Sequence, residues 1–142
     1  MIPQPGRVLS DLAMKLALSI APETTSSFAM ANTGLISLLM LSLAQDSERA
    51  VANRMLDIED MKALFRSEDA QPAPGADLRA AYCDGAPAGL RLSEMDAFHG
   101  EGLTMLIDLH AWAEAHSAPL DQAIWQFLRT HTERNKFDLP DL

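Results

Sequence analysis

Cysteine is almost absent from this chain of 142 residues, with Cys83 as its single example. One thiol excludes an internal disulfide framework and a cluster of thiolate metal ligands. A chain of this length buries about 70% of the surface that it exposes when unfolded, so it can form a core without such cross-links. We therefore expect one domain over residues 1–142, held together by apolar packing.

β-Branched residues are also scarce. Val, Ile and Thr total 14 residues, whereas Ala, Leu and Met total 51. The abundant types are strong helix formers, and the scarce types are those that strands favour. The composition therefore predicts an all-α fold.

Basic residues are few, with 11 Lys and Arg residues against 20 Asp and Glu residues. The resulting net charge of −9 repels phosphate backbones and anionic membranes, so we expect neither a nucleic acid nor a membrane as partner. The longest uncharged run covers residues 24–45, but only residues 35–44 are densely apolar. A run of about 10 is typical of a buried core helix, and we expect a cytoplasmic protein.

Apolar residues recur at helical spacing along most of the chain. The pattern predicts an up-and-down bundle of four to five helices. Their expected ranges are about 7–20, 22–45, 47–66, 93–116 and 119–134. Asp46 and Ser47 are typical of a helix start and separate the second helix from the third. Because neither Gly nor Pro lies between those two, one long helix is the alternative. In the third helix, Asp57 belongs to the polar face.

Residues 67–92 differ from the rest in containing Pro72, Pro74, Gly75, Gly85, Pro87 and Gly89. These residues predict a long loop, with one turn of helix near residues 77–83 as a further possibility. Loops of this length are either functional or disordered, and the few apolar anchors favour disorder. We expect proteases to cut here first.

Known catalytic motifs are missing. The sequence contains no GxxxxGK[ST], GxGxxG, HExxH, GxSxG or CxxC pattern. We therefore predict no catalytic residue, and the sequence favours a non-enzymatic protein, with an enzyme left open as the alternative.

The C-terminal third nevertheless has an unusual chemistry. All four histidines follow residue 98, and residues 93–142 contain nine acidic and three basic side chains. Two glycines flank Glu101, where a local break in a helix would open a cleft. This pattern makes His99, Glu101, His110 and Trp112 the candidate ligand-binding residues.

A metal ion is a weaker hypothesis for the same region. Di-iron helical bundles need an ExxH step on each of two helices, and this chain offers only the DxxH step from Asp96 to His99. His99 and His110 lie three helical turns apart, roughly 16 Å, too far to share one ion. We predict no metal site and no cofactor from the sequence.

The densely apolar run at residues 35–44 suggests what the protein does. It is apolar around nearly its whole circumference, which is typical of a central helix or a subunit interface. We expect a non-enzymatic interaction or regulatory protein that binds a protein partner through this surface, most simply as a homodimer. The alternative is a small-ligand- or metal-binding helical protein, including an enzyme, with its site at the four candidate residues.

Overall fold

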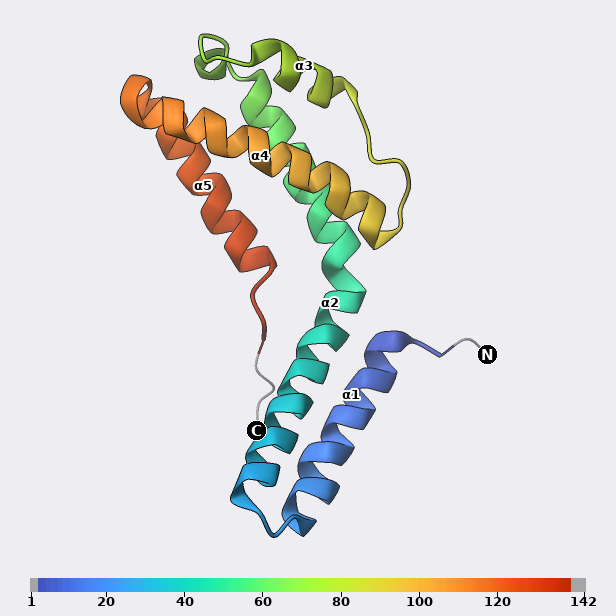
Figure 1. The fold of residues 1–142 in the computed structure, drawn as a ribbon. Helices are drawn as coiled ribbons and strands as arrows, with labels where there is room; N and C mark the ends of the chain where they lie inside the picture. The colour runs from blue at the N-terminus through green and yellow to red at the C-terminus, as the bar shows by residue number, and fades with distance from the viewer. Residues whose placement is uncertain (1–2, 139–142) are drawn as a thin grey trace. The chain divides into compact units, whose positions relative to one another are not determined.

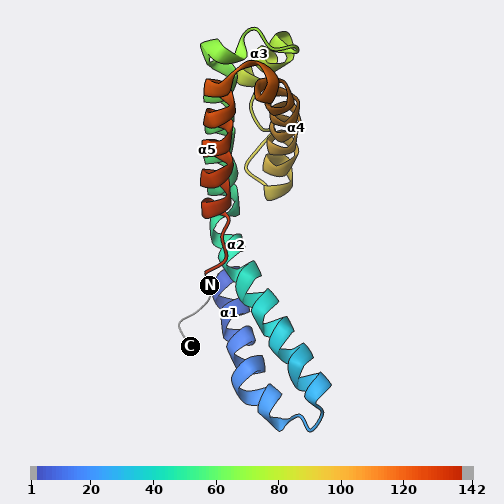
Figure 2. The same ribbon diagram turned by 90° about the vertical axis from the view of Figure 1, so that its left-hand side faces the viewer.

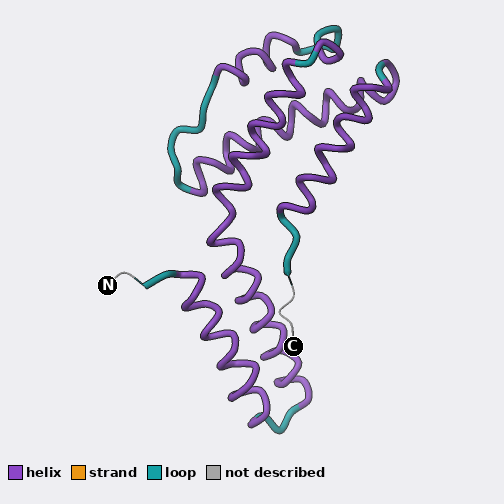
Figure 3. Tube along the Cα trace, turned by 180° about the vertical axis from the view of Figure 1, so that it is seen from behind, coloured by secondary structure: helices purple, strands orange, loops and turns teal. Residues whose placement is uncertain are grey.

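The computed structural model describes residues 3–138, and every regular element in that range is helical (Figures 1 and 3). The prediction of an all-α helical bundle is confirmed. The five α-helices are α1 (Pro5–Lys15), α2 (Ser27–Arg66), α3 (Ala76–Asp84), α4 (Leu92–His116) and α5 (Ala118–Arg134). A π-helical turn at Leu16–Ile20 and 3-10 turns at Ala21–Glu23 and Glu68–Ala70 complete the set.

The chain divides into two compact units, a division that its length and composition do not indicate. Unit 1 contains the described residues up to Ala50 together with Phe137 and Asp138, and unit 2 is Val51–Lys136. Helix α2 contributes its first half to unit 1 and its second half to unit 2.

Helix α2 corrects two of the predicted boundaries. Ser47 does not start a new helix, because its hydroxyl donates back to the Ala44 carbonyl at 2.8 Å within a continuous helix. With neither Gly nor Pro between residues 45 and 47, nothing interrupts the backbone ladder. At the other end, Pro22 and Glu23 form a 3-10 turn, and α2 begins only at Ser27.

Unit 1 is a helical hairpin that packs through small residues. Ala13, Ser37 and Ala44 are buried there, and Gly6 approaches α2 so closely that a Cβ atom would lie 3.0 Å from the Ala44 carbonyl oxygen. Small side chains allow this approach, and many of the larger apolar side chains of both helices lie outside the contact. Ser37 is 3% exposed, whereas Leu43 is 58% exposed.

Asp138, the last residue that the structure describes, is held against α2 within unit 1. The Gln45 side-chain amide donates to the Asp138 carbonyl at 2.6 Å, and the Asp138 amide donates to Gln45 Oε1 at 3.0 Å. Arg49 also pairs with the Asp138 carboxylate at 3.2 Å.

The segment at 67–92 contains helix α3 where the sequence predicts a helical turn near residues 77–83, and its flanking turns are packed rather than disordered. Helix α3 buries Tyr82 and Cys83 in the core of unit 2. Arg79, also buried, donates to the carbonyl oxygens of Pro74, Ala70 and Ala73 at 2.6, 2.7 and 3.1 Å. One guanidinium thus satisfies three loop carbonyls, and a composition rich in Pro and Gly does not reveal that role.

The core of unit 2 lies between the second half of α2 and helices α3, α4 and α5 (Figures 1 and 2). Its most buried large side chains are Met61, Met95, Leu109, Leu120 and Ile124. Helix α4 begins at Leu92, one residue before the predicted start, and the amide of its N-cap residue Arg91 donates to Glu94 Oε2 at 3.1 Å. A single residue, Ser117, joins α4 to α5 and caps α5 through its hydroxyl.

Candidate functional site

Three helices of unit 2 converge on one buried carboxylate, that of Asp57 on α2. His99 Nε2 of α4 lies 3.3 Å from Asp57 Oδ2, and His131 Nδ1 of α5 lies 2.6 Å from the same oxygen. Arg134 of α5 donates to the other oxygen, Oδ1, at 2.8 Å. We call these four residues the Asp57 cluster.

The electrostatics of the Asp57 cluster favour an ionised carboxylate. Burial acts to raise the pKa of Asp57, but hydrogen bonds from His99, Arg134 and His131 outweigh it and lower the pKa to about 2. Arg134 also binds Asp60 at 2.6 Å, so its guanidinium bridges two carboxylates. Burial acts to lower the pKa of Arg134, but these two carboxylates raise it above its usual value.

The aromatic rings in and beside the Asp57 cluster stack on one another. The rings of His99 and His131 lie 5.8 Å apart and are nearly parallel, and Phe127 stacks beyond His131 at 6.0 Å. His99 is buried, whereas the side chain of His131 is 30% exposed. The cluster therefore reaches solvent on the His131 side.

A second group of polar side chains lies where α4 approaches the start of α5. His110 Nε2 is 3.0 Å from Asp121 Oδ1, and the His110 ring meets Trp125 edge to face. Glu114, also within reach, is exposed. We call His110, Glu114 and Asp121 the His110 cluster.

The structure places the four predicted site residues in different surroundings. His99 belongs to the Asp57 cluster and His110 to the His110 cluster. Glu101 is exposed, and Trp112 is half-buried with its ring stacked on His116 at 4.8 Å. The chain does not bring these four side chains together around one cavity.

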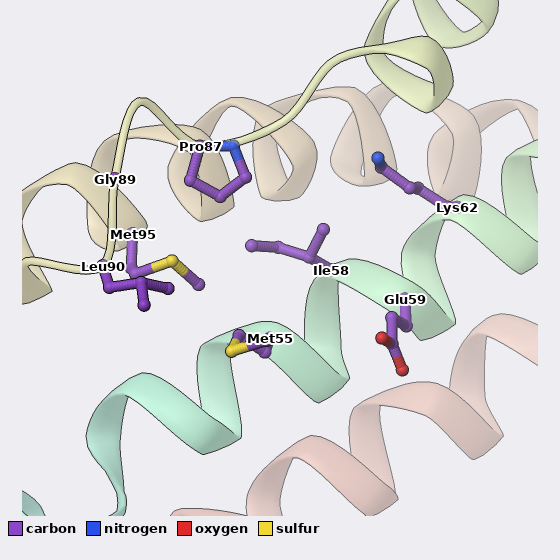
Figure 4. A pocket seen from close by; sticks show the side chains of 8 residues that line it. All are labelled: Met55, Ile58, Glu59, Lys62, Pro87, Gly89, Leu90 and Met95. Carbon is purple, nitrogen blue, oxygen red and sulfur yellow. The ribbon is translucent and has the colours of Figure 1, made fainter.

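A pocket of about 270 Å³ lies elsewhere in unit 2, between α2 and the chain that leads into α4 (Figure 4). Its lining is mostly apolar and consists of Met55, Ile58, Glu59, Lys62, Pro87, Gly89, Leu90 and Met95. Lys62 donates to the Gly85 carbonyl at 2.6 Å, so the one cation of the pocket already has a partner. The volume is just below the ~300–1,000 Å³ typical of small-molecule sites.

Sequence reasoning missed Asp57, which it assigned to a solvent face. The signal in the sequence was Asn53, which lies one helical turn earlier and therefore on the same face of the helix as Asp57. The structure buries both residues. The Asn53 side-chain amide donates to the Arg134 carbonyl at 2.8 Å. Asn53 and Asp57, one helical turn apart, thus form a buried polar contact with α5.

Comparisons with known proteins add no further assignment. No protein-family model matches the chain, no curated protein is similar to it, and no solved structure resembles it.

Proposed function

We propose that this protein is a non-enzymatic interaction protein that associates with a second copy of itself through the outer surface of the unit 1 hairpin. The observation that carries the proposal is the inverted distribution of side chains there. Ala13, Ser37 and Ala44 are buried there, whereas many large apolar side chains face outward. The outward set comprises Val8, Leu12, Met14, Leu18, Ile20, Phe28, Met30, Leu35, Ile36, Leu38, Leu39 and Leu43.

The size of this surface supports a stable interface. These 12 residues are between 40% and 75% exposed, and at roughly 150–200 Å² per large apolar residue their summed exposed area is on the order of 1,000 Å². The largest apolar patch of a typical monomer is about 300–600 Å². A standard interface buries about 800 Å² on each partner, so the hairpin offers what a dimer needs.

A second copy fits this surface better than a bilayer does. Helix α2 is long and apolar enough to cross a membrane, with a mean hydropathy of 1.6 over 18 residues. Its neighbour α1, however, has exposed charges at Arg7, Asp11 and Lys15, spaced four residues apart along one stripe. Two hairpins can form a four-helix bundle that buries the apolar faces and leaves this stripe in water.

Sedimentation equilibrium at micromolar concentration tests the proposal, and we expect twice 15.5 kDa. The Leu39→Gln, Leu43→Gln double variant should sediment as a monomer that keeps its helical circular dichroism, because both side chains are exposed. Ile107→Gln is the matched control. It replaces an exposed apolar residue of α4 in unit 2, and the variant should remain a dimer.

Two outcomes would contradict self-association. The first is a wild-type monomer at these concentrations. The second is flotation of the wild-type protein with neutral phosphatidylcholine vesicles, which would make the hairpin a membrane anchor.

A second candidate function, metal binding, is favoured by a different observation. The convergence of a carboxylate and two imidazoles at Asp57 lies in unit 2 and does not depend on the hairpin.

A further inference from the structure

Three possible metal-ligand atoms already lie close together in the Asp57 cluster. Asp57 Oδ2, His99 Nε2 and His131 Nδ1 are all within 4.8 Å of one another. Around a zinc ion with bonds of about 2.0–2.1 Å, tetrahedral ligand atoms lie roughly 3.3 Å apart. The oxygen is 3.3 Å from His99 Nε2 and 2.6 Å from His131 Nδ1. The His99 distance already matches this spacing, whereas His131 Nδ1 would have to move away from the oxygen to reach it.

We propose that Asp57, His99 and His131 bind a divalent transition-metal ion of the zinc class. Two imidazole nitrogens with one carboxylate oxygen suit Zn²⁺, Fe²⁺, Co²⁺ or Ni²⁺, whereas Mg²⁺ and Ca²⁺ prefer oxygen ligands throughout. Three protein ligands leave at least one coordination position for water. The exposed side of His131 is the route by which an ion enters.

Arg134 supports this assignment rather than competing with it. Its guanidinium occupies Asp57 Oδ1, which leaves Oδ2 as the oxygen that faces both imidazoles. Carboxylates that bind metals are commonly held in place by a hydrogen bond from a second residue. Asp60 shares the positive charge of Arg134, which reduces its repulsion of a bound cation. Arg134 is therefore a positioning residue.

The His110 cluster provides an internal comparison. It also holds three possible ligand atoms within 4.8 Å of one another, but it has only one imidazole and its Glu114 is exposed to water. A solvated carboxylate is a weak ligand for a zinc-class ion without a second nitrogen donor. We expect binding at the Asp57 cluster and none at the His110 cluster.

Calorimetric titration of the wild-type protein with Zn²⁺ at pH 7.5 tests the proposal. We expect one ion per chain and a higher melting temperature in its presence. His131→Gln should weaken binding by at least 100-fold, and His110→Gln should leave it unchanged. His131 is the first choice for substitution because it is the most exposed of the three ligands.

A spectroscopic readout keeps the test independent of how well the variants fold. In the wild-type protein, Zn²⁺ should shift the imidazole NMR signals of His99 and His131 and leave those of His110 and His116 in place. The proposal is overturned if stoichiometric Zn²⁺ does not bind, if the His110 signals shift instead, or if folded His131→Gln binds as tightly as the wild type.

Discussion

The reactivity expected of Cys83 depends on its surroundings in the fold. Its place in a segment rich in Pro and Gly suggests an exposed thiol, yet the residue is buried in α3. Burial raises the pKa of the Cys83 thiol, and the nearby Arg66 and Lys62 only partly oppose that effect. The thiolate is the reactive form, so both access and ionisation are suppressed.

We predict that Cys83 reacts slowly with a disulfide reagent such as DTNB at pH 8, at least 100-fold more slowly than in urea-unfolded protein. The thiol pKa is higher in the folded state than in the unfolded state. Its contribution to stability is therefore complete below the unfolded pKa, near 9, and is lost as the pH rises further. Labelling rates of folded and unfolded protein measure this directly. Equal rates would place the thiol at the surface.

At the scale of a single element, helix α4 contains two glycines with different surroundings, one crowded and one open. A Cβ atom at Gly102 would lie 2.7 Å from Tyr82 Cζ and 2.8 Å from Met61 Cε, and it would also meet the Tyr82 hydroxyl. At Gly100, by contrast, no atom lies within 4 Å of such a Cβ. Only Gly102 is therefore needed for the packing of α3 and α2 against α4.

This difference gives a matched pair of substitutions. Gly102→Ala should lower the free energy of unfolding by about 1–3 kcal/mol, because the ring of Tyr82 cannot retreat within a packed core. Gly100→Ala should raise it by about 1 kcal/mol through helix propensity alone. Urea unfolding of both variants and the wild type measures the two effects. Equal changes in the two variants would mean that Tyr82 does not contact Gly102.

At the scale of the whole molecule, the exposed apolar surface of the unit 1 hairpin affects how stability depends on protein concentration. If two copies associate through it, unfolding is linked to dissociation, and stability depends on protein concentration. We predict that the melting temperature rises as the protein concentration is raised from about 1 to 100 μM.

The Leu39→Gln, Leu43→Gln variant should melt at a temperature that does not change over this range, because its interface is lost. Differential scanning calorimetry at several concentrations measures both proteins. A wild-type melting temperature independent of concentration would contradict the dimer.

The sequence by itself determined the fold class and most of the helices. An excess of Ala, Leu and Met, together with apolar residues at helical spacing, leaves little alternative to an all-α bundle, since both properties act locally. The predicted start of the last helix, residue 119, likewise lies one residue after the observed start at Ala118.

The tertiary structure decided which side chains meet. Asp57, His99 and His131 are separated by 42 and 32 residues, and no local spacing reveals that α2, α4 and α5 converge on one carboxylate. Residues 67–92 are held by Arg79, which binds three carbonyls of the segment, and by Lys62 and Arg66 of α2, which bind the carbonyls of Gly85 and Cys83. The exposed apolar surface of unit 1 depends on how closely its two helices approach. The Asp57 cluster rests on contacts between distant parts of the chain, and a local pattern contains no information about such contacts.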